Sequence, residues 1–128
     1  MDVAGHYLAE KVATASRMEL TAMLFDKVVQ RLKQAMGAAE SQDWTTLRHL
    51  LMRAQDIIDE LRGSLDLSTG QIASNLEALY AWVMRRLIDA NIRRDVSGIR
   101  DALDVLAPLQ TTWREICRDP SVTSPVPA

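Results

Sequence analysis

The sequence predicts an all-α protein, an antiparallel up-down four-helix bundle, and three observations support this prediction. Helix-breaking residues are rare, because only 5 Gly and 4 Pro occur in 128 residues, and three of the prolines lie after residue 119. The rest of the chain contains four segments in which apolar residues recur every three or four positions, the spacing of one helix face. The connections between these segments are short, so neighbouring helices must run antiparallel.

The first segment of the chain lacks a regular pattern. Residues 1–15 carry apolar side chains without a sustained period, so we expect an irregular leader. Ser16 and Glu19 then form a capping box, in which each side chain satisfies a backbone N–H of the other residue. This box predicts that the first long helix starts at residue 17.

The remaining helices are delimited by polar residues that favour helix starts. Asp43 and Asp95 are candidate N-caps, and Ser68 with Gln71 offers a second capping box. The bundle should occupy residues 16–119, followed by a disordered tail at 120–128 that has nothing to bury. We expect helices at about 17–40, 44–66, 69–93 and 96–118.

The composition restricts the class of protein. Hydrophobic residues make up 48 % of the chain and charged residues 25 %, as in a globular protein. The net charge of −2 argues against a general nucleic-acid binder, which needs a positive surplus. The start of the chain does not resemble a signal peptide, and no apolar run approaches the roughly 20 residues that span a bilayer. We therefore expect a cytosolic protein without membrane insertion.

No residues are spaced for a catalytic or metal site. Bundle metal sites use inward Glu and Glu-x-x-His pairs, but Thr46 stands three residues before His49, and His6 falls in the leader. Cys117 is either a reactive thiol or a small apolar residue beside Trp113, and the second reading is favoured. We expect no enzyme, no bound metal and no cofactor.

Surplus apolar residues are the positive functional signal. Leu20, Met23 and Leu24 widen the apolar surface of the first helix beyond a single stripe. Trp82 lies about 200° from the seam of its own helix at 100° per residue, near Ala78, so it can face outward. These five residues are candidates for a groove that binds a partner helix. The alternative is that Trp82 packs against a neighbouring helix or the leader.

Two arginine pairs also allow more than one reading. Arg85-Arg86 and Arg93-Arg94 have acidic residues nearby in sequence, so they can form a solvated face with local ion pairs. They could also contact an acidic partner surface or, less readily, nucleic acid. The sequence favours the ion-paired face and leaves the other two open.

An ordered series of motifs resembles the flagellin-specific export chaperones, the FliS family. The resemblance covers most of the chain, from Tyr7 to about Ile116, and Trp113 is the last residue that carries it. One local departure is Leu24-Phe25-Asp26-Lys27, where the family usually has Leu-Tyr-Asp-Gly. The motifs are TAS-x-x-EL from Thr14, MLFD from Met23, RAQDIIDELRGSLD from Arg53, Gly70, and IASNLEALYAWVMRRLIDANIRRD from Ile72.

The resemblance implies a four-helix chaperone that binds the C-terminal segment of newly made flagellin, whose amphipathic helices pack together in the filament. Capture would prevent premature polymerisation and support type III export, with the export gate as a candidate second partner. The resemblance also implies that the leader, through Tyr7 with Leu8 and Val12, can cap an apolar groove. Free protein is expected as a monomer or weak homodimer. The alternative is a regulatory or self-associating adaptor of the same secretion system.

Overall fold

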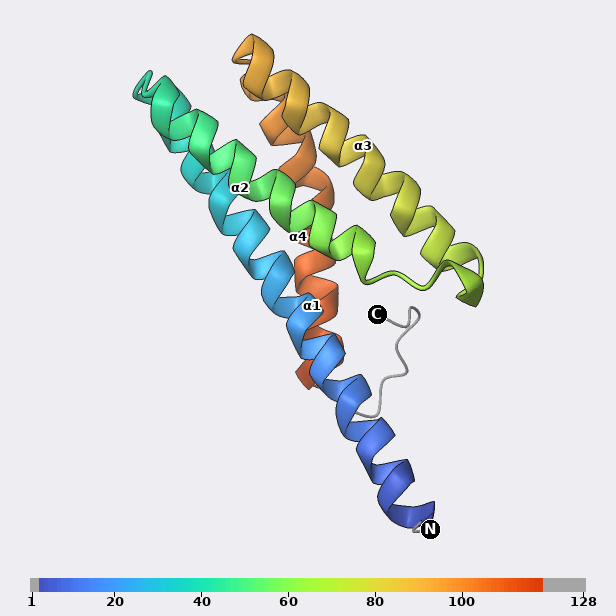
Figure 1. Ribbon diagram of the computed structural model, residues 1–128. Helices are drawn as coiled ribbons and strands as arrows, with labels where there is room; N and C mark the ends of the chain where they lie inside the picture. Colours follow the sequence, from blue (N-terminus) through green and yellow to red (C-terminus); the bar gives the residue numbers. More distant parts are fainter. Residues whose placement is uncertain (1–2, 119–128) are drawn as a thin grey trace.

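Four long helices and one short 3-10 turn make up the described part of the computed structural model (Figure 1). The structure describes residues 3–118, without the side chains of residues 6, 7, 9–16 and 69. The predicted tail at 120–128 lies outside the described residues. The elements are α1 Val3–Glu40, α2 Trp44–Gly63, η1 Leu67–Thr69, α3 Gln71–Arg93 and α4 Val96–Arg118.

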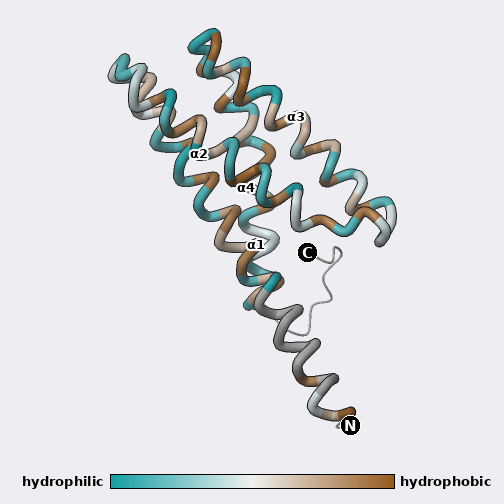
Figure 2. Tube along the Cα trace, in the orientation of Figure 1, coloured by the Kyte–Doolittle hydropathy of each residue, from teal (hydrophilic) through white to brown (hydrophobic). Residues whose placement is uncertain are grey.

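The helices pack in a ring. α1 contacts α2 and α4, and α3 contacts the same two helices, so α1 and α3 lie diagonally opposite each other. Polar and apolar colours alternate along each helix in Figure 2, as expected when one face is buried and the other is solvated. This arrangement confirms the predicted all-helical bundle. No helix in residues 3–118 has a stretch long and apolar enough to cross a membrane.

The core is centred on three aromatic side chains from three helices. Phe25 of α1 is fully buried, and its ring lies 6.4 Å from that of Tyr80 and 5.5 Å from that of Trp113. Burial raises the pKa of the Tyr80 hydroxyl above its usual value, so this group stays neutral in the core. Leucine, isoleucine, valine and alanine side chains fill the rest of the interior.

The turns at one end of the bundle are short and similar in construction. In the α1–α2 turn, Gln42 adopts a left-handed conformation (φ 56°), and the Asp43 N–H donates to the carbonyl of Ala38. In the α3–α4 turn, Arg94 adopts the same conformation, and the Asp95 N–H donates to the carbonyl of Ala90. These are the bonds of a helix-terminating Schellman motif. They reverse the chain within a few residues.

Two of the three predicted helix caps between the helices are confirmed. The Asp43 carboxylate accepts a bond from the Thr46 N–H, and the Asp95 carboxylate accepts one from the Ser97 N–H. The predicted Ser68–Gln71 box is wrong. Asp66 instead accepts a bond from the Ser68 N–H and caps the 3-10 turn, so α3 begins at Gln71 without a side-chain cap.

The predicted irregular leader and the helix start at residue 17 are also wrong. α1 is continuous from Val3 to Glu40, and its N-terminal part projects past the other helices (Figure 1). Residues 3–16 contain no proline and several alanines. Extending a helix that has already nucleated fixes one residue for each new hydrogen bond and avoids a second nucleation cost. A capping box at Ser16 is therefore not enough to start the helix there.

A pair of glycine substitutions tests the packing of α4 against α3. A Cβ at Gly98 would lie 2.9 Å from the carbonyl oxygen of Arg86 and 3.3 Å from the Cβ of Ala90. We expect Gly98→Ala to lower the free energy of unfolding by about 1–3 kcal/mol, because backbone must move. Nothing lies within 4 Å of a Cβ at Gly37. Gly37→Ala should therefore stabilise the helix by about 0.5–1 kcal/mol.

Urea unfolding of both variants measures these changes. The two substitutions add the same methyl group to a helix, so their opposite signs isolate the close approach at Gly98 from helix propensity. A Gly98→Ala variant as stable as the unmodified protein would contradict the packing of α4 on α3.

Candidate protein-binding surfaces

The polar side chains between the helices form structural pairs. Arg62 of α2 pairs with Glu77 of α3 at 2.6 Å, and Arg86 of α3 pairs with Asp101 of α4 at 2.7 Å. Asp26 of α1 accepts bonds from two α4 residues: Gln110 (2.8 Å) and Arg114. Among the described side chains, no cluster of three or more His, Cys, Asp or Glu is placed to hold a metal ion. Each of these three ion pairs joins two helices.

Cys117 does not have the surroundings of an activated nucleophile. Its thiol is exposed and donates a weak bond to the carbonyl of Met18, with sulfur and oxygen 3.6 Å apart. Partial burial, together with the negative charge of Glu19, raises the pKa of this thiol above its usual value. The thiolate, which is the nucleophilic form, is therefore disfavoured at neutral pH.

The Asp26 contacts make the bundle sensitive to acid. Partial burial alone raises the pKa of Asp26, but bonds from Gln110 and Arg114 and the Arg114 charge outweigh this effect and lower it below 3.8. A carboxyl whose pKa is lowered by folding contributes stability above its unfolded pKa and loses it as the pH falls. We expect the midpoint urea concentration of unfolding to decrease as the pH is lowered below about 4. In Asp26→Asn this decrease should be smaller. If the urea midpoint depends on pH equally in both proteins, the Asp26–Arg114 pair does not stabilise the fold.

The predicted groove residues are divided between two opposite helices. Leu20 and Met23 of α1 are 54 % and 52 % exposed, whereas Leu24 is only 6 % exposed and belongs to the core. On α3, Ala78 is exposed, but Trp82 is half-buried and packs against the core. Since α1 and α3 do not contact each other along their backbones, these residues do not line one groove.

The expectations for Leu24 and Trp82 are corrected by the same physical reason. The angle of a residue on a helical wheel shows its direction from its own helix axis, but not which helix lies in that direction. Leu24 lies four residues before Val28 on the buried face of α1, and Trp82 is partly buried against the core. For Trp82, the alternative of packing against a neighbouring helix is therefore the better description.

The leader residues cannot be assigned to a groove. Of the three residues expected to cap it, Leu8 is 58 % exposed in a helix that projects away from the bundle. Leu8 therefore covers no groove in this structure. The side chains of Tyr7 and Val12 lie outside the described residues.

Exposed apolar side chains that the sequence analysis missed lie on α2 and α3. Met52, Ile88 and Ile92 are 49 %, 39 % and 75 % exposed. Ile88 and Ile92 are spaced by four and lie off the seam of α3, so this pair was visible in the sequence as a second apolar surface. Contiguous exposed apolar patches mark partner-binding sites in soluble proteins, so these side chains are candidates for such a surface.

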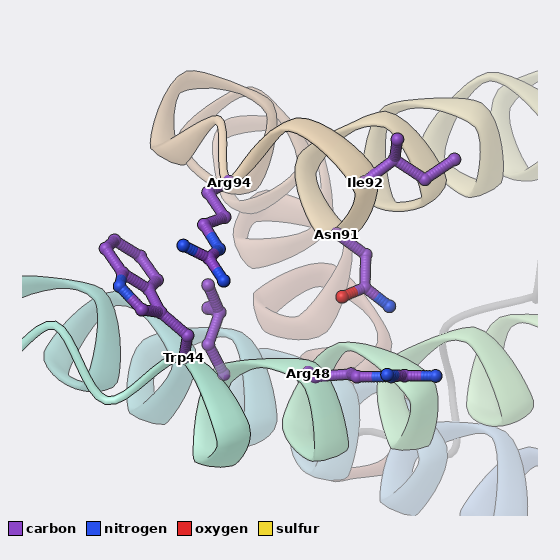
Figure 3. Close-up of a pocket in the computed structure, with 6 residues that line it drawn as sticks. Trp44, Arg48, Asn91, Ile92 and Arg94 are labelled. Atoms are coloured by element: carbon purple, nitrogen blue, oxygen red, sulfur yellow. The ribbon is translucent and has the colours of Figure 1, made fainter.

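A hollow lies beside Ile92 at the end of the bundle where both short turns meet (Figure 3). Its volume is about 340 Å³, and it lies between α2 and α3. The guanidinium of Arg94 stands 4.9 Å from the centre of the Trp44 ring. The lining residues are Trp44, Leu47, Arg48, Asn91, Ile92 and Arg94.

The fold and these surfaces define a helical-bundle protein that exposes large apolar side chains on α1, α2 and α3. Comparison with known proteins names the family. The family model described as flagellar protein FliS matches residues 2–120, and the chain belongs to that family. FliS is a family of chaperones, not of enzymes.

Three curated relatives illustrate the similarity, and each is named flagellar secretion chaperone FliS. The protein of Escherichia coli K12 is 34 % identical over 113 residues, covering 87 % of this chain and 83 % of the relative. The protein of Salmonella typhimurium LT2 is 36 % identical over 107 residues, covering 82 % and 79 %. The protein of Bacillus subtilis 168 is 28 % identical over 109 residues, covering 85 % and 81 %.

Proposed function

We propose that this protein is a cytosolic export chaperone that binds the C-terminal helical segment of flagellin. Binding would keep flagellin from polymerising before export and support its delivery to the type III export gate. Family membership makes this protein a relative of flagellar secretion chaperones. The identity of the client, the cytosolic location and the contact with the export gate are parts of the proposal.

The observation that carries the proposal is the exposure of large apolar side chains on several helices. Leu20 and Met23 on α1, and Ile88 and Ile92 on α3, are each more than a third exposed. They lie on opposite helices of the ring. A client that reaches both must wrap around the bundle, as a segment without fixed tertiary structure can do. Such a segment folds on binding and buries its own apolar face.

A polymerisation assay tests this function. Purified flagellin is seeded with short filaments, and its growth is followed by light scattering with increasing amounts of the chaperone. We expect growth to stop near one chaperone per flagellin, because each captured C-terminal segment removes one subunit. Growth that continues in a molar excess of folded chaperone would overturn the proposal. If the chaperone itself forms oligomers under those conditions, a self-associating adaptor becomes the better description.

A further inference from the structure

The hollow lined by Trp44, Arg48, Ile92 and Arg94, here called the Trp44–Arg94 hollow, lies where the α1–α2 and α3–α4 turns meet. Among the proposed flagellin contacts it includes only Ile92. The two arginine pairs, Arg85-Arg86 and Arg93-Arg94, differ in their contacts. Arg86 is held by Asp101 in an ion pair. Arg94 instead has its guanidinium over the Trp44 ring, in a cation–π contact. The reading as an ion-paired face therefore holds for Arg86 but not for Arg94.

The backbone at Arg94 is unusual for an arginine. This residue ends α3 in the left-handed conformation, with φ 54° and ψ 40°. Glycine is the residue preferred at such a position, because it has no Cβ to clash with the following carbonyl. The chain nevertheless places a long cationic side chain here, against the half-buried Trp44. The side chain thus occupies a position that glycine would hold with less strain.

Two arginine side chains without an ion pair among the described residues line the hollow. Arg48 and Arg94 both line it, and neither has a carboxylate partner within 4.0 Å among the described residues. The two aspartates of the adjoining turns cap helices and form no ion pair with Arg48 or Arg94. Asp43 accepts bonds from Thr46, and Asp95 accepts bonds from Ser97. Two guanidinium groups are therefore free to bind an anion from outside, and their planar forks suit a carboxylate.

The walls of the hollow are apolar beside these charges. Ile92 is 75 % exposed at one side. A second hollow of about 420 Å³ shares Trp44, Arg48 and Arg94 and adds Met52, which is 49 % exposed. A free inorganic anion would contact the guanidinium groups and leave these apolar surfaces in water. A peptide with acidic and apolar side chains covers both.

We propose that the Trp44–Arg94 hollow is a docking site for an acidic, apolar peptide segment of a partner protein. Figure 3 shows the Arg48 side chain extended along α2, away from Arg94. One carboxylate of the segment therefore binds Arg94 and another binds Arg48. Apolar side chains between them pack against Trp44 at one side of the hollow and against Ile92 at the other. This site goes beyond the proposed capture of flagellin. It shares Ile92 with the proposed client surface but does not include Leu20, Met23 or Ile88.

Nuclear magnetic resonance titration of the full chain tests the proposal. The probe is a short end-blocked peptide that alternates leucine and glutamate, compared with the same peptide carrying glutamine in place of glutamate. The three tryptophans supply separate indole N–H signals. We expect a saturable shift of the Trp44 indole and the Arg94 amide, with Trp82 and Trp113 unchanged. The glutamine peptide should bind about tenfold more weakly than the glutamate peptide, and added salt should lower the affinity of the glutamate peptide.

The variants are chosen to leave the fold intact. Arg94→Gly removes the guanidinium at a backbone position that glycine prefers, and Arg48→Gln changes an exposed side chain. Each substitution should lower the affinity for the glutamate peptide by about fivefold or more. Arg53→Gln is the matched control, because Arg53 is an exposed arginine of α2 that does not line the hollow. It should bind like the unmodified protein.

Several results would overturn the inference. Equal binding of the glutamate and glutamine peptides would remove the role of charge, and equal shifts with inorganic phosphate alone would reduce the site to a simple anion site. Unchanged peptide affinity in Arg48→Gln and Arg94→Gly would remove the hollow. If these variants instead lose affinity for the flagellin segment, the hollow belongs to the client surface. In that case the separate site is wrong and the proposed function stands.

Discussion

Replacing Phe25 with alanine is expected to lower the free energy of unfolding by about 3–5 kcal/mol. The Phe25 ring is fully buried and lies between Tyr80 of α3 and Trp113 of α4, so its removal leaves a cavity where three helices meet. A loss of this size is a large part of the roughly 5–15 kcal/mol that stabilises a typical domain. Urea unfolding followed by circular dichroism measures it.

Met23→Ala is the matched control for the loss at Phe25. Met23 lies two residues away on the same helix and is 52 % exposed, so its truncation leaves no internal cavity. The free energy of unfolding of this variant should change by less than about 0.5 kcal/mol. If Phe25→Ala costs no more than Met23→Ala, the aromatic cluster is not the centre of the core.

The second large effect concerns the client. Leu20→Gln combined with Met23→Gln is expected to weaken binding of flagellin's C-terminal segment by about tenfold or more, or at least 1.4 kcal/mol. Both side chains are about half exposed on α1, so they are available to a partner. Glutamine is similar in size and favours helix, but it does not gain from leaving water as leucine and methionine do. Isothermal titration calorimetry measures the affinity.

The control for this pair keeps the same chemistry at another place. Lys33→Gln with Glu40→Gln also introduces two glutamines at exposed positions of α1 and leaves the net charge unchanged. This variant should bind the segment with the affinity of the unmodified protein. If both pairs behave alike, Leu20 and Met23 do not contact the client, and the exposed residues of α3 become the main candidates.

Most of the fold was predictable because its signals are local. The end of α1, the start of α2 and both ends of α4 were predicted correctly. Their polar caps, Asp43 and Asp95, make the expected bonds to the first helical turn. A buried seam such as Leu76, Tyr80 and Val83 also reads directly from spacing, because only one face of each helix meets the core.

The start of α1 was not predictable in the same way. Ser16 and Glu19 have the spacing of a capping box, but that spacing shows that a helix can begin there, not that it must. Where the helix starts depends on whether the preceding residues can extend it toward the N-terminus. Residues 3–16 do so here, and the extension carries α1 beyond the other helices.

The candidate surfaces were only partly predictable because they depend on neighbours. Leu20 and Met23 are exposed as expected, whereas Leu24 joins the core and Trp82 packs against it. The Trp44–Arg94 contact joins residues fifty positions apart in sequence, and no periodicity relates two separate turns. Predicting a contact across the bundle requires knowing which helix ends lie together, and only the folded structure shows this.

The proposed binding of flagellin's C-terminal segment buries apolar surface of both proteins. Calorimetric titration with roughly the last 40 residues of flagellin, repeated at several temperatures, tests it most directly. We expect saturable 1:1 binding with a large negative heat-capacity change, the mark of apolar burial coupled to folding of the segment. Absence of binding, with circular dichroism showing a folded helical protein, would contradict it.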